Sequence, residues 1–192
     1  MNEFFNYKSR LKPEKGRVLI SEPYLPDPNF ERTVVLLCEH NDDGSFGFVL
    51  NRPSGLFFED IIDQGKGFKE KIYVGGPVQQ DTLHFLHRAE YLEGGEPVMD
   101  DCLWGGNFEQ LMTLIENNTL DPEDFRFFIG YSGWGAGQLE DELEANSWIV
   151  SDILNQKMVF DYRPEDLWRE VLKEMGGKFN MYSNYPIDPR LN

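Results

Sequence analysis

The sequence has few basic side chains, few cysteines and no long apolar run. It carries 18 Lys and Arg against 34 Asp and Glu, a net charge of −16. Nucleic-acid binding needs cations that displace counterions from phosphates, so this balance excludes a typical nucleic-acid partner. No apolar run approaches the roughly 20 residues of a membrane span. The start, MNEFFNYKSRLKPEKGR, has no apolar signal core, and we expect a cytoplasmic protein.

Metal-binding and disulfide-forming side chains are also scarce. The two cysteines, Cys38 and Cys102, do not make a disulfide framework and are expected to be free thiols. Together with three histidines they are too few and too badly spaced for a closed metal site. The sequence therefore predicts no structural metal, and we expect no cofactor.

The acidic charge is concentrated in one stretch. Residues 81–150 hold 15 acidic and 2 basic side chains, a net charge of −13. An acidic surface keeps a cytosolic protein in solution, and this explanation accounts for most of the excess. The alternative is that the 81–150 surface docks a basic protein partner.

Strand and helix patterns interleave along the chain. Apolar runs predict strands at 17–21, 33–38, 46–50, 71–74 and 82–87, and the turn at 41–44 predicts a β-hairpin over 33–50. Helices are predicted at 57–62, from Asn107, from Gln138 and from Pro164 to the Gly176-Gly177 pair, with Asn107 and Gln110 forming a capping box. Phe108, Leu111, Met112 and Ile115 are expected on one buried face. The hairpin favours antiparallel pairing and an α+β fold.

No linker divides the 192 residues. We expect a single domain over 17–177, an N-terminal extension over 1–16 and a C-terminal tail over 178–192. The final segment, NYPIDPRLN, carries two prolines and is either an extended strap along the body or loose.

A glycine-rich segment follows the apolar run 125–129, with glycines at 130, 133, 135 and 137, and leads into a helix. Strand, glycine loop and helix is an arrangement that binds phosphates. However, no Gly-Lys-Ser/Thr is present, and the glycine spacing is not GxGxxG. Glu140 and Asp141 in the first helical turn would repel a phosphate. We therefore predict a structural turn, with Trp134 packed closely against bare backbone.

Cys38 and His40 share one face of the 33–38 strand and its end, as alternation along an extended chain requires. They could form a nucleophile and its base, or two metal ligands. The simpler interpretation, a buried thiol and a histidine at a turn, is favoured. His87, near a strand end, is a better candidate for polar chemistry than His84. Asp81 is either a turn residue or a carboxylate partner of His87.

Glu142 and Asn146 fall on the inward stripe of the helix from Gln138, whereas Glu140 and Glu144 face water. A half-buried carboxylate must find hydrogen-bond donors or take up a proton, which makes Glu142 a functional candidate. The favoured interpretation is that Glu142 accepts hydrogen bonds from amides of the glycine segment and so ties it to the helix.

Three blocks in order resemble one bacterial family, called YqgE/AlgH or UPF0301. They are PYLPDPNFERTVVLLCEHNDDGSFGFVLNRP (23–53), GGPVQQDTLHFLH (75–87) and GYSGWGAGQLEDELEANSW (130–148). The resemblance runs from about Val18 to about Gly176. It implies a single α+β domain built on a mixed, largely antiparallel, partly barrel-like sheet with packed helices. The family is largely uncharacterised, and some members carry the label "transcriptional regulator" from a link to alginate production.

The polar positions typical of the family supply a candidate site without assigned roles. As residues of this chain they are Asp27, Arg32, Cys38, Glu39, His40, Asn41, Asn51, Asp81, His87, Glu140, Glu142 and Asn146. The candidate polar site drawn from them consists of Asp27, Arg32, Cys38, His40, Asn51, Asp81, His87, Glu142 and Asn146.

Two functions of different classes remain open. The first is a non-catalytic cytosolic regulatory or protein-interaction domain whose polar residues stabilise turns. The second is an enzyme or small-molecule binder with a polar pocket around Arg32, Cys38, His40, His87 and Glu142. Direct transcription-factor activity is disfavoured, because the chain shows no helix-turn-helix and no basic face. The two can be told apart by geometry, since an active site requires its side chains to converge.

Overall fold

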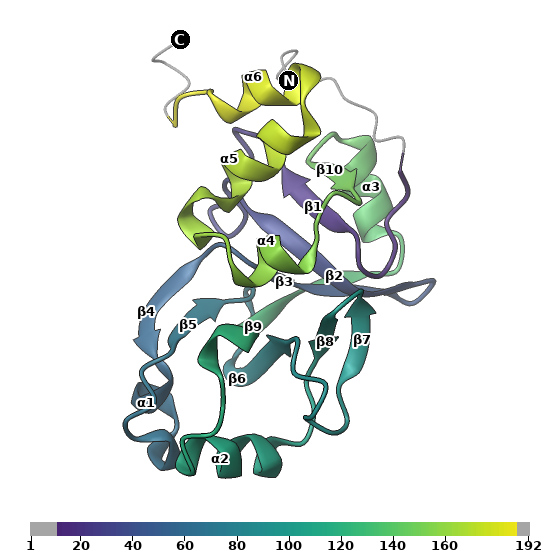
Figure 1. The fold of residues 1–192 in the computed structure, drawn as a ribbon. Coiled ribbons are helices and arrows are strands. Elements are labelled where there is room, and N and C mark those ends of the chain that lie inside the picture. Colours follow the sequence, from purple (N-terminus) through teal and green to yellow (C-terminus); the bar gives the residue numbers. More distant parts are fainter. Residues whose placement is uncertain (1–10, 188–192) are drawn as a thin grey trace.

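The computed structural model describes residues 11–187, which form one mixed sheet covered by helices (Figure 1). The strands are β1 (Val18–Ser21), β2 (Val34–Asn41), β3 (Gly44–Val49), β4 (Pro53–Phe57), β5 (Lys71–Val74), β6 (Val78–His87), β7 (Glu96–Met99), β8 (Cys102–Trp104), β9 (Phe125–Gly135) and β10 (Trp148–Ser151). The α-helices are α1 (Phe58–Ile61), α2 (Phe108–Glu116), α3 (Gln138–Glu144), α4 (Gln156–Phe160), α5 (Pro164–Met175) and α6 (Gly177–Ser183), and short 3-10 turns η1 and η2 span Asp63–Gly65 and Pro122–Asp124.

The strands follow the order β10-β1-β2-β3-β9-β6-β8-β7, and β5 and β4 branch from β9. The pairs along this path are antiparallel, whereas β5 runs parallel to β9. This confirms the expected α+β class with a mixed, largely antiparallel sheet. The sheet is not closed into a barrel, because β10 and β7 remain its two ends and do not pair with each other.

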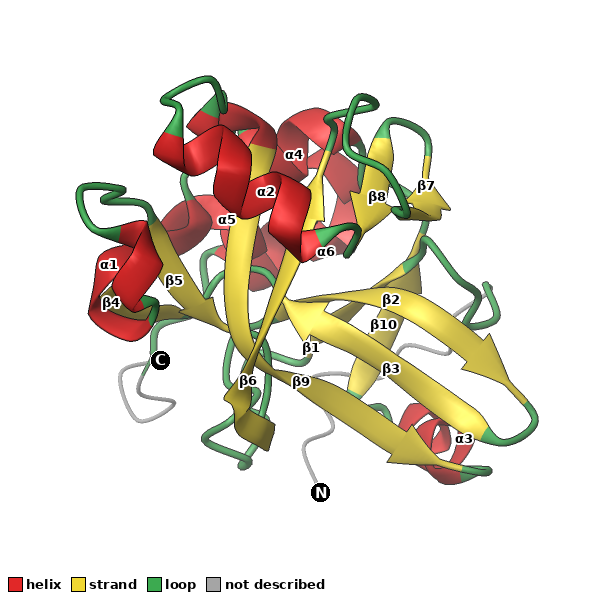
Figure 2. Ribbon diagram, turned by 90° about the horizontal axis from the view of Figure 1, so that it is seen from below, coloured by secondary structure: helices red, strands yellow, loops and turns green. Residues whose placement is uncertain are grey.

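Strand β2 is apolar on both faces because it separates two cores. Val34, Leu36 and Cys38 pack in a cluster with residues of α4 and α5. Val35 and Leu37, of opposite parity, pack in another cluster that includes residues of α3 and β10. The predicted hairpin over 33–50 is confirmed as the antiparallel pair β2–β3. Figure 2 shows this hairpin extending from the body with α3 near its outer end.

A further core lies between helices α1 and α2 and strands β5, β6 and β9. Asn107 caps α2 by accepting a hydrogen bond from the Gln110 backbone, 3.0 Å. A capping box also requires the Gln110 side chain to accept from the Asn107 backbone N–H, and this part of the prediction is wrong. The Gln110 side chain instead accepts from the Glu93 backbone N–H and donates to the Tyr91 carbonyl. Phe108 is 41% exposed, contrary to prediction, because the first turn of α2 lies outside this cluster.

Gly130, Gly133 and Gly135 lie in a strand, so the predicted turn is wrong for them, whereas Ala136 and Gly137 do form a turn before α3. Strand β9 continues through Gly135; its first half pairs with β5 and β6, and its second half pairs with β3. Gly130 lies between the two halves with φ +66°, and a Cβ there would come within 2.7 Å of the Gly76 carbonyl oxygen. Glycine at this position lets β9 change partners within one continuous strand.

Strands β4, β7, β8 and β10 and helices α4 and α6 are absent from the predicted elements. They are short, and only β10 is uniformly buried. Within the tail, residues 178–187 are described and 188–192 lie outside the described residues, as do residues 1–10 of the expected N-terminal extension.

Candidate functional site

The turn that precedes β2 is fixed by two of the candidate side chains. Asp27 Oδ1 accepts a hydrogen bond from the Asn29 backbone, 2.8 Å. Asn51 Oδ1 accepts from the Val34 backbone, 2.9 Å, and Asn51 Nδ2 donates to the Arg32 carbonyl, 2.9 Å. The Asn51 amide thereby takes the place of a neighbouring strand, because it satisfies the backbone carbonyl of Arg32 and the backbone N–H of Val34. Arg32 itself has a φ of +49°. Both side chains are engaged in stabilising the turn.

Arg32 extends from this turn to the end of the described chain. Its Nη2 donates to the carbonyl oxygen of Tyr185 at 2.8 Å and to that of Pro186 at 2.6 Å. The guanidinium carbon lies 4.9 Å from the Trp168 ring centroid. Burial, and secondarily the charge of Arg169, lowers the pKa of Arg32. At Tyr185 and Pro186 the tail therefore contacts the body, as the first of its two alternatives requires.

Cys38 lies in the core and not beside His40. Its side chain is 3% exposed, and burial raises the pKa of its thiol well above the ordinary range. The register of β2 against β3 shifts between Leu37 and Glu39. This bulge interrupts the strand alternation on which the Cys38–His40 pairing was based. A protonated, buried thiol is a poor nucleophile.

His40 instead contacts the opposite strand and α3. Its Nδ1 lies 2.7 Å from the Ser45 hydroxyl, and its Nε2 lies 3.7 Å from Glu140 Oε1. The histidine thus joins the end of the hairpin to the first turn of α3, as expected for a histidine at a turn.

His87 is fully buried. Its Nδ1 lies 3.1 Å from the Ala89 carbonyl oxygen and its Nε2 lies 2.8 Å from that of Gly105, while its ring stacks on Phe125. Burial lowers the pKa of His87, and hydrogen bonds to the two carbonyls oppose this effect. Asp81 is exposed at the irregular start of β6, within the register shift that precedes Leu83.

Glu142 accepts hydrogen bonds from two tryptophans. Its Oε2 receives the indole N–H of Trp148 at 2.7 Å and that of Trp134 at 2.9 Å. Its Oε1 receives the Gln138 amide at 3.0 Å. Glu142 therefore ties α3 to the end of β9, but through indole donors and not through the backbone amides that the sequence suggested.

Asn146 ends α3 in the left-handed region, with φ +57°. Its Oδ1 and the Nε of Arg32 are, within residues 11–187, the buried side-chain polar atoms that lack a hydrogen-bond partner. They lie on different segments, and neither is paired with another candidate residue.

The candidate polar side chains thus occupy separate places. Arg32 binds the tail, Cys38 lies in one core, His87 lies in another, His40 joins the hairpin to α3, and Glu142 binds two indoles. Across the described residues, no hydrogen bond or ion pair links any two of these five. The arrangement lacks the nucleophile–base contact that covalent catalysis uses.

The structure has a groove of about 590 Å³ next to the β2–β3 hairpin. Its walls come from β2, β3, β6, β8 and β9. The lining residues are Glu39, Asn41, Asp43, Gly44, Ser45, Phe46, Val78, His84, Trp104, Tyr131, Gly133 and Trp134.

The floor of this groove is a face of the sheet at β2, β3 and β9. Glu39, Phe46 and Gly133 are register partners across these strands, and Gly44 pairs with Gly135 further along. Partnered residues project from the same face of a sheet, so the Glu39 carboxylate stands beside the Phe46 ring. Gly133 has no side chain of its own, and the Tyr131 ring lies 3.3 Å from the place that a Cβ there would take.

Aromatic rings form the sides. Phe46 meets Trp104 edge-on with centroids 4.8 Å apart, and it meets Tyr131 at 6.1 Å. His84 lies 6.0 Å from Tyr131 and 6.5 Å from Trp104. The four rings are each partly exposed and line one continuous surface.

The charge around this groove is of one sign. Glu39 and Asp43 line it, whereas no lysine or arginine does. Burial lowers the pKa of His84, so this imidazole is neutral at physiological pH. An aromatic surface with a carboxylate rim favours a cation.

Sequence reasoning missed this groove. Glu39 and Asn41 are typical family positions, but the four rings lie on four strands far apart in the chain. Only the pairing of β3, β9, β6 and β8 brings them together. The alternation along β3 and β9 shows which side each ring faces, but not which strands are neighbours.

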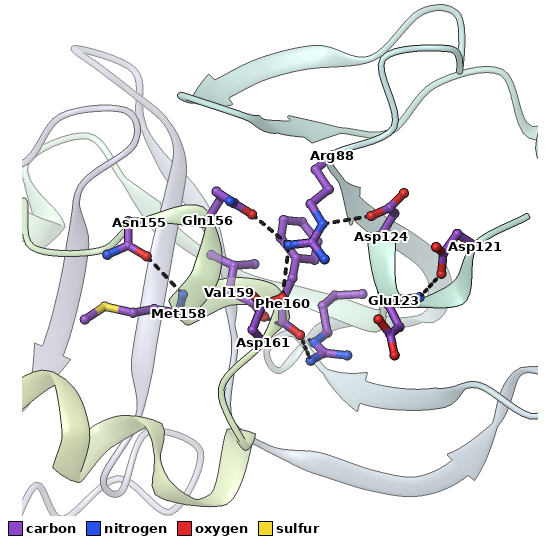
Figure 3. Close-up of polar contacts among 11 residues, drawn as sticks. Arg88, Asp121, Glu123, Asp124, Asn155, Gln156, Met158, Val159, Phe160 and Asp161 are labelled. Atoms are coloured by element: carbon purple, nitrogen blue, oxygen red, sulfur yellow. Dashed lines mark hydrogen bonds and ion pairs between the residues drawn. The ribbon is translucent and has the colours of Figure 1, made fainter.

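Arg88 makes a separate polar cluster away from the groove (Figure 3). Its Nε donates to Asp124 at 2.8 Å, and its Nη1 donates to Gln156 at 2.8 Å and to Asp161 at 3.0 Å. The hydrogen bond to Asp124 is the main cause that raises the pKa of Arg88. This cluster fixes α4 to the body and uses one of the two basic residues of 81–150.

The acidic side chains of 81–150 do not form one surface. Glu109 and Glu116 lie on α2, and Glu140, Asp141 and Glu144 lie on α3. These two helices lie far apart in the molecule (Figures 1 and 2). The concentration of charge in sequence is therefore divided in space.

Two other features were searched for over residues 11–187. No group of three or more His, Cys, Asp or Glu side chains in that range could hold a metal ion. No helix in that range has both the length and the apolar character needed to cross a bilayer.

Comparison with known proteins identifies relatives along almost the whole chain. A family model described as AlgH-like matches residues 18–180. A UPF0301 protein of Cytophaga hutchinsonii is 52% identical over 93% of this chain and 98% of its own length. One from Chlorobium limicola is 41% identical over the full length of both chains.

Two solved structures are similar. The solution structure of AlgH from Pseudomonas aeruginosa, a UPF0301 protein, has a TM-score of 0.70 and 31% identity, covering 92% of this chain and 98% of that one. A crystal structure of a Corynebacterium diphtheriae protein has a TM-score of 0.76 at 24% identity, covering 96% of this chain and 100% of that one, and supports the fold alone.

Proposed function

The chain belongs to the AlgH-like family, and we propose that it is a non-catalytic cytosolic interaction domain that binds a protein partner in the groove beside the β2–β3 hairpin. The observation that carries this proposal is a contrast between two sets of side chains. The candidate polar residues are used within the fold, while partly exposed aromatic rings are left lining a groove.

Each candidate for catalysis has a structural occupation. Arg32 binds the tail, Cys38 is buried as a thiol, and Glu142 accepts two indole N–H groups. An active site requires such groups to share a place where a reacting atom could sit. The dispersal of these side chains among separate partners favours a structural role for them.

The aromatic side chains of the groove, unlike the polar candidates, are left partly exposed at the surface. Phe46, His84, Trp104 and Tyr131 are partly exposed and adjacent. Aromatic residues are enriched at the centres of protein interfaces, where a few of them supply most of the binding energy. This surface therefore provides an interaction site without further rearrangement of the fold.

The proposal is tested by comparing Trp104→Ala with Tyr91→Ala. Tyr91 is 50% exposed and does not line the groove, so it controls for removal of a surface aromatic ring. Quantitative co-purification from the native cell, followed by binding of the purified components, should recover a defined partner with wild type and Tyr91→Ala. Recovery should fail with Trp104→Ala, although this variant keeps the wild-type circular dichroism spectrum.

Two results would overturn the proposal. One is a partner that binds wild type and Trp104→Ala equally. The other is turnover of a small metabolite by the purified protein that disappears when His40 or Arg32 is replaced, because catalysis would then depend on the polar residues and not on the groove.

A further inference from the structure

We infer that the groove recognises an arginine side chain carried by an extended segment of the protein partner. This inference rests on the proposed function and names the chemistry of its partner. It follows from three properties of the groove: its aromatic walls, its unpaired carboxylates and its lack of cations.

The aromatic walls offer ring faces and edges at large angles to one another. The Phe46 and Trp104 planes are inclined at 62°, and those of His84 and Tyr131 at 84°. A cation is attracted to the faces of such rings when it lies within about 6 Å of a centroid. The planar guanidinium group also stacks on rings and is more weakly hydrated than an ammonium group, which favours arginine over lysine.

The carboxylates at the rim are available to a ligand. Among residues 11–187, no lysine or arginine forms an ion pair with Glu39 or Asp43. Glu39 accepts one hydrogen bond, from the Asn41 amide at 2.9 Å. Both side chains are exposed and line the groove; Glu39 is the register partner of Phe46, and Asp43 lies in the turn between β2 and β3. A guanidinium group can donate two parallel hydrogen bonds to a carboxylate, a geometry that ammonium lacks.

Within residues 11–187, no lysine or arginine lines this groove. Burial lowers the pKa of its one histidine, His84, which disfavours the charged imidazolium. The net charge of −16 adds a long-range attraction for a basic partner. Charge complementarity thus points to a cationic occupant.

The groove is also larger than one guanidinium group needs. At about 590 Å³ it spans five strands and lies open along the hairpin. Gly44 and Gly133 contribute backbone and no side chain to its lining, so a neighbouring peptide backbone can approach the sheet there. These dimensions favour an arginine that belongs to a peptide segment over a free small cation.

The test uses short acetylated and amidated peptides of alternating glycine and serine around one central residue. The central residue is arginine, lysine or citrulline, the neutral isostere of arginine. Binding is followed by the chemical shifts of Tyr131 and Trp104 amides in the full chain. Loss of the charge should weaken binding by about tenfold, because a cation–aromatic contact is worth on the order of 1 kcal/mol and a carboxylate contact adds to it. Lysine should bind with intermediate affinity.

Variants locate the site. Glu39→Gln combined with Asp43→Asn should weaken arginine-peptide binding several-fold and reduce its dependence on salt. Asp141→Asn combined with Glu144→Gln removes the same charge from exposed positions of α3 and should leave binding unchanged. Trp104→Ala should abolish the shift changes while Tyr91→Ala retains them.

The inference fails if the citrulline peptide binds as tightly as the arginine peptide, or if choline alone matches the arginine peptide. It also fails if the α3 double variant weakens binding as much as the groove double variant. If partner recovery depends on Trp104 while no arginine peptide binds, the proposed function stands and this inference is wrong. If partner recovery does not depend on Trp104 and no arginine peptide binds, both the proposed function and this inference are wrong.

Discussion

Replacing Glu142 with alanine tests whether one carboxylate holds α3 against the end of β9. The substitution removes the acceptor for the indole N–H groups of Trp134 and Trp148 and for the Gln138 amide. Trp148 is 1% exposed and Trp134 is 5% exposed, so neither indole reaches bulk water easily.

The magnitude follows from those two buried donors. An unsatisfied buried donor costs about 1–3 kcal/mol, so the variant should lose roughly 2–6 kcal/mol of unfolding free energy. For a chain of this size the melting temperature should fall by roughly 4–24 °C. Glu142→Gln keeps one acceptor oxygen and the side-chain shape, and its loss should be about half as large.

The control is Glu144→Ala, two residues further along the same helix. Glu144 is exposed and makes no side-chain hydrogen bond within the described residues. Its removal deletes the same charge and should cost no more than about 0.5 kcal/mol. The comparison therefore separates the effect of the two indole contacts from the effect of charge on α3.

Urea denaturation followed by tryptophan fluorescence and by circular dichroism gives both free energies. Coincident transitions would establish that unfolding is two-state and that the comparison is valid. Equal and small losses for Glu142→Ala and Glu144→Ala would refute the reasoning, because the indole N–H groups would then be satisfied without Glu142.

Three other measurements test separate parts of the structure. Burial lowers the pKa of His84 and His87 below 6.5, so the unfolded chain takes up protons first: stability is complete above about pH 7 and falls as the pH drops through 6.5. Melting temperatures that do not change between pH 7.5 and 5.5 would contradict this, and His84→Gln should flatten the slope. Burial raises the pKa of Cys102 to about 12 and also raises that of Cys38 well above its ordinary range, so iodoacetamide should label both thiols rapidly in urea and only slowly in the native protein; rapid native labelling would show that they are accessible. The net charge of −16 predicts no sequence-specific duplex-DNA binding at physiological salt in a titration, and submicromolar, sequence-dependent binding would be decisive against it.

Local patterns were informative where one side chain acts on nearby backbone. The hairpin over 33–50, the strand at 71–74, the short helix near 57–62 and the Asn107 cap follow from turn residues, short apolar runs and capping chemistry, and the structure contains all of them. The inward direction of Glu142 also follows from helical periodicity.

Patterns failed where the partner lies far along the chain. The glycines at 130, 133 and 135 suggested a turn, yet they lie within β9, and Gly130 is where this strand passes from its pairing with β5 and β6 to its pairing with β3. The bulge at Cys38 separated it from His40, because strand alternation holds only while the register is regular. The donors to Glu142 are side chains brought together by packing, which helical periodicity does not specify.

By itself, the sequence determined the α+β class, the acidic charge, the family and the positions of several elements, because composition, period and turn chemistry are local properties. Only the tertiary structure decided that Arg32, His40, His87 and Glu142 are held apart by separate partners. It also decided that Phe46, His84, Trp104 and Tyr131 meet in one groove. The physical reason is that strand neighbours in a sheet are chosen by burial across the whole chain, and side chains converge only after those neighbours are fixed.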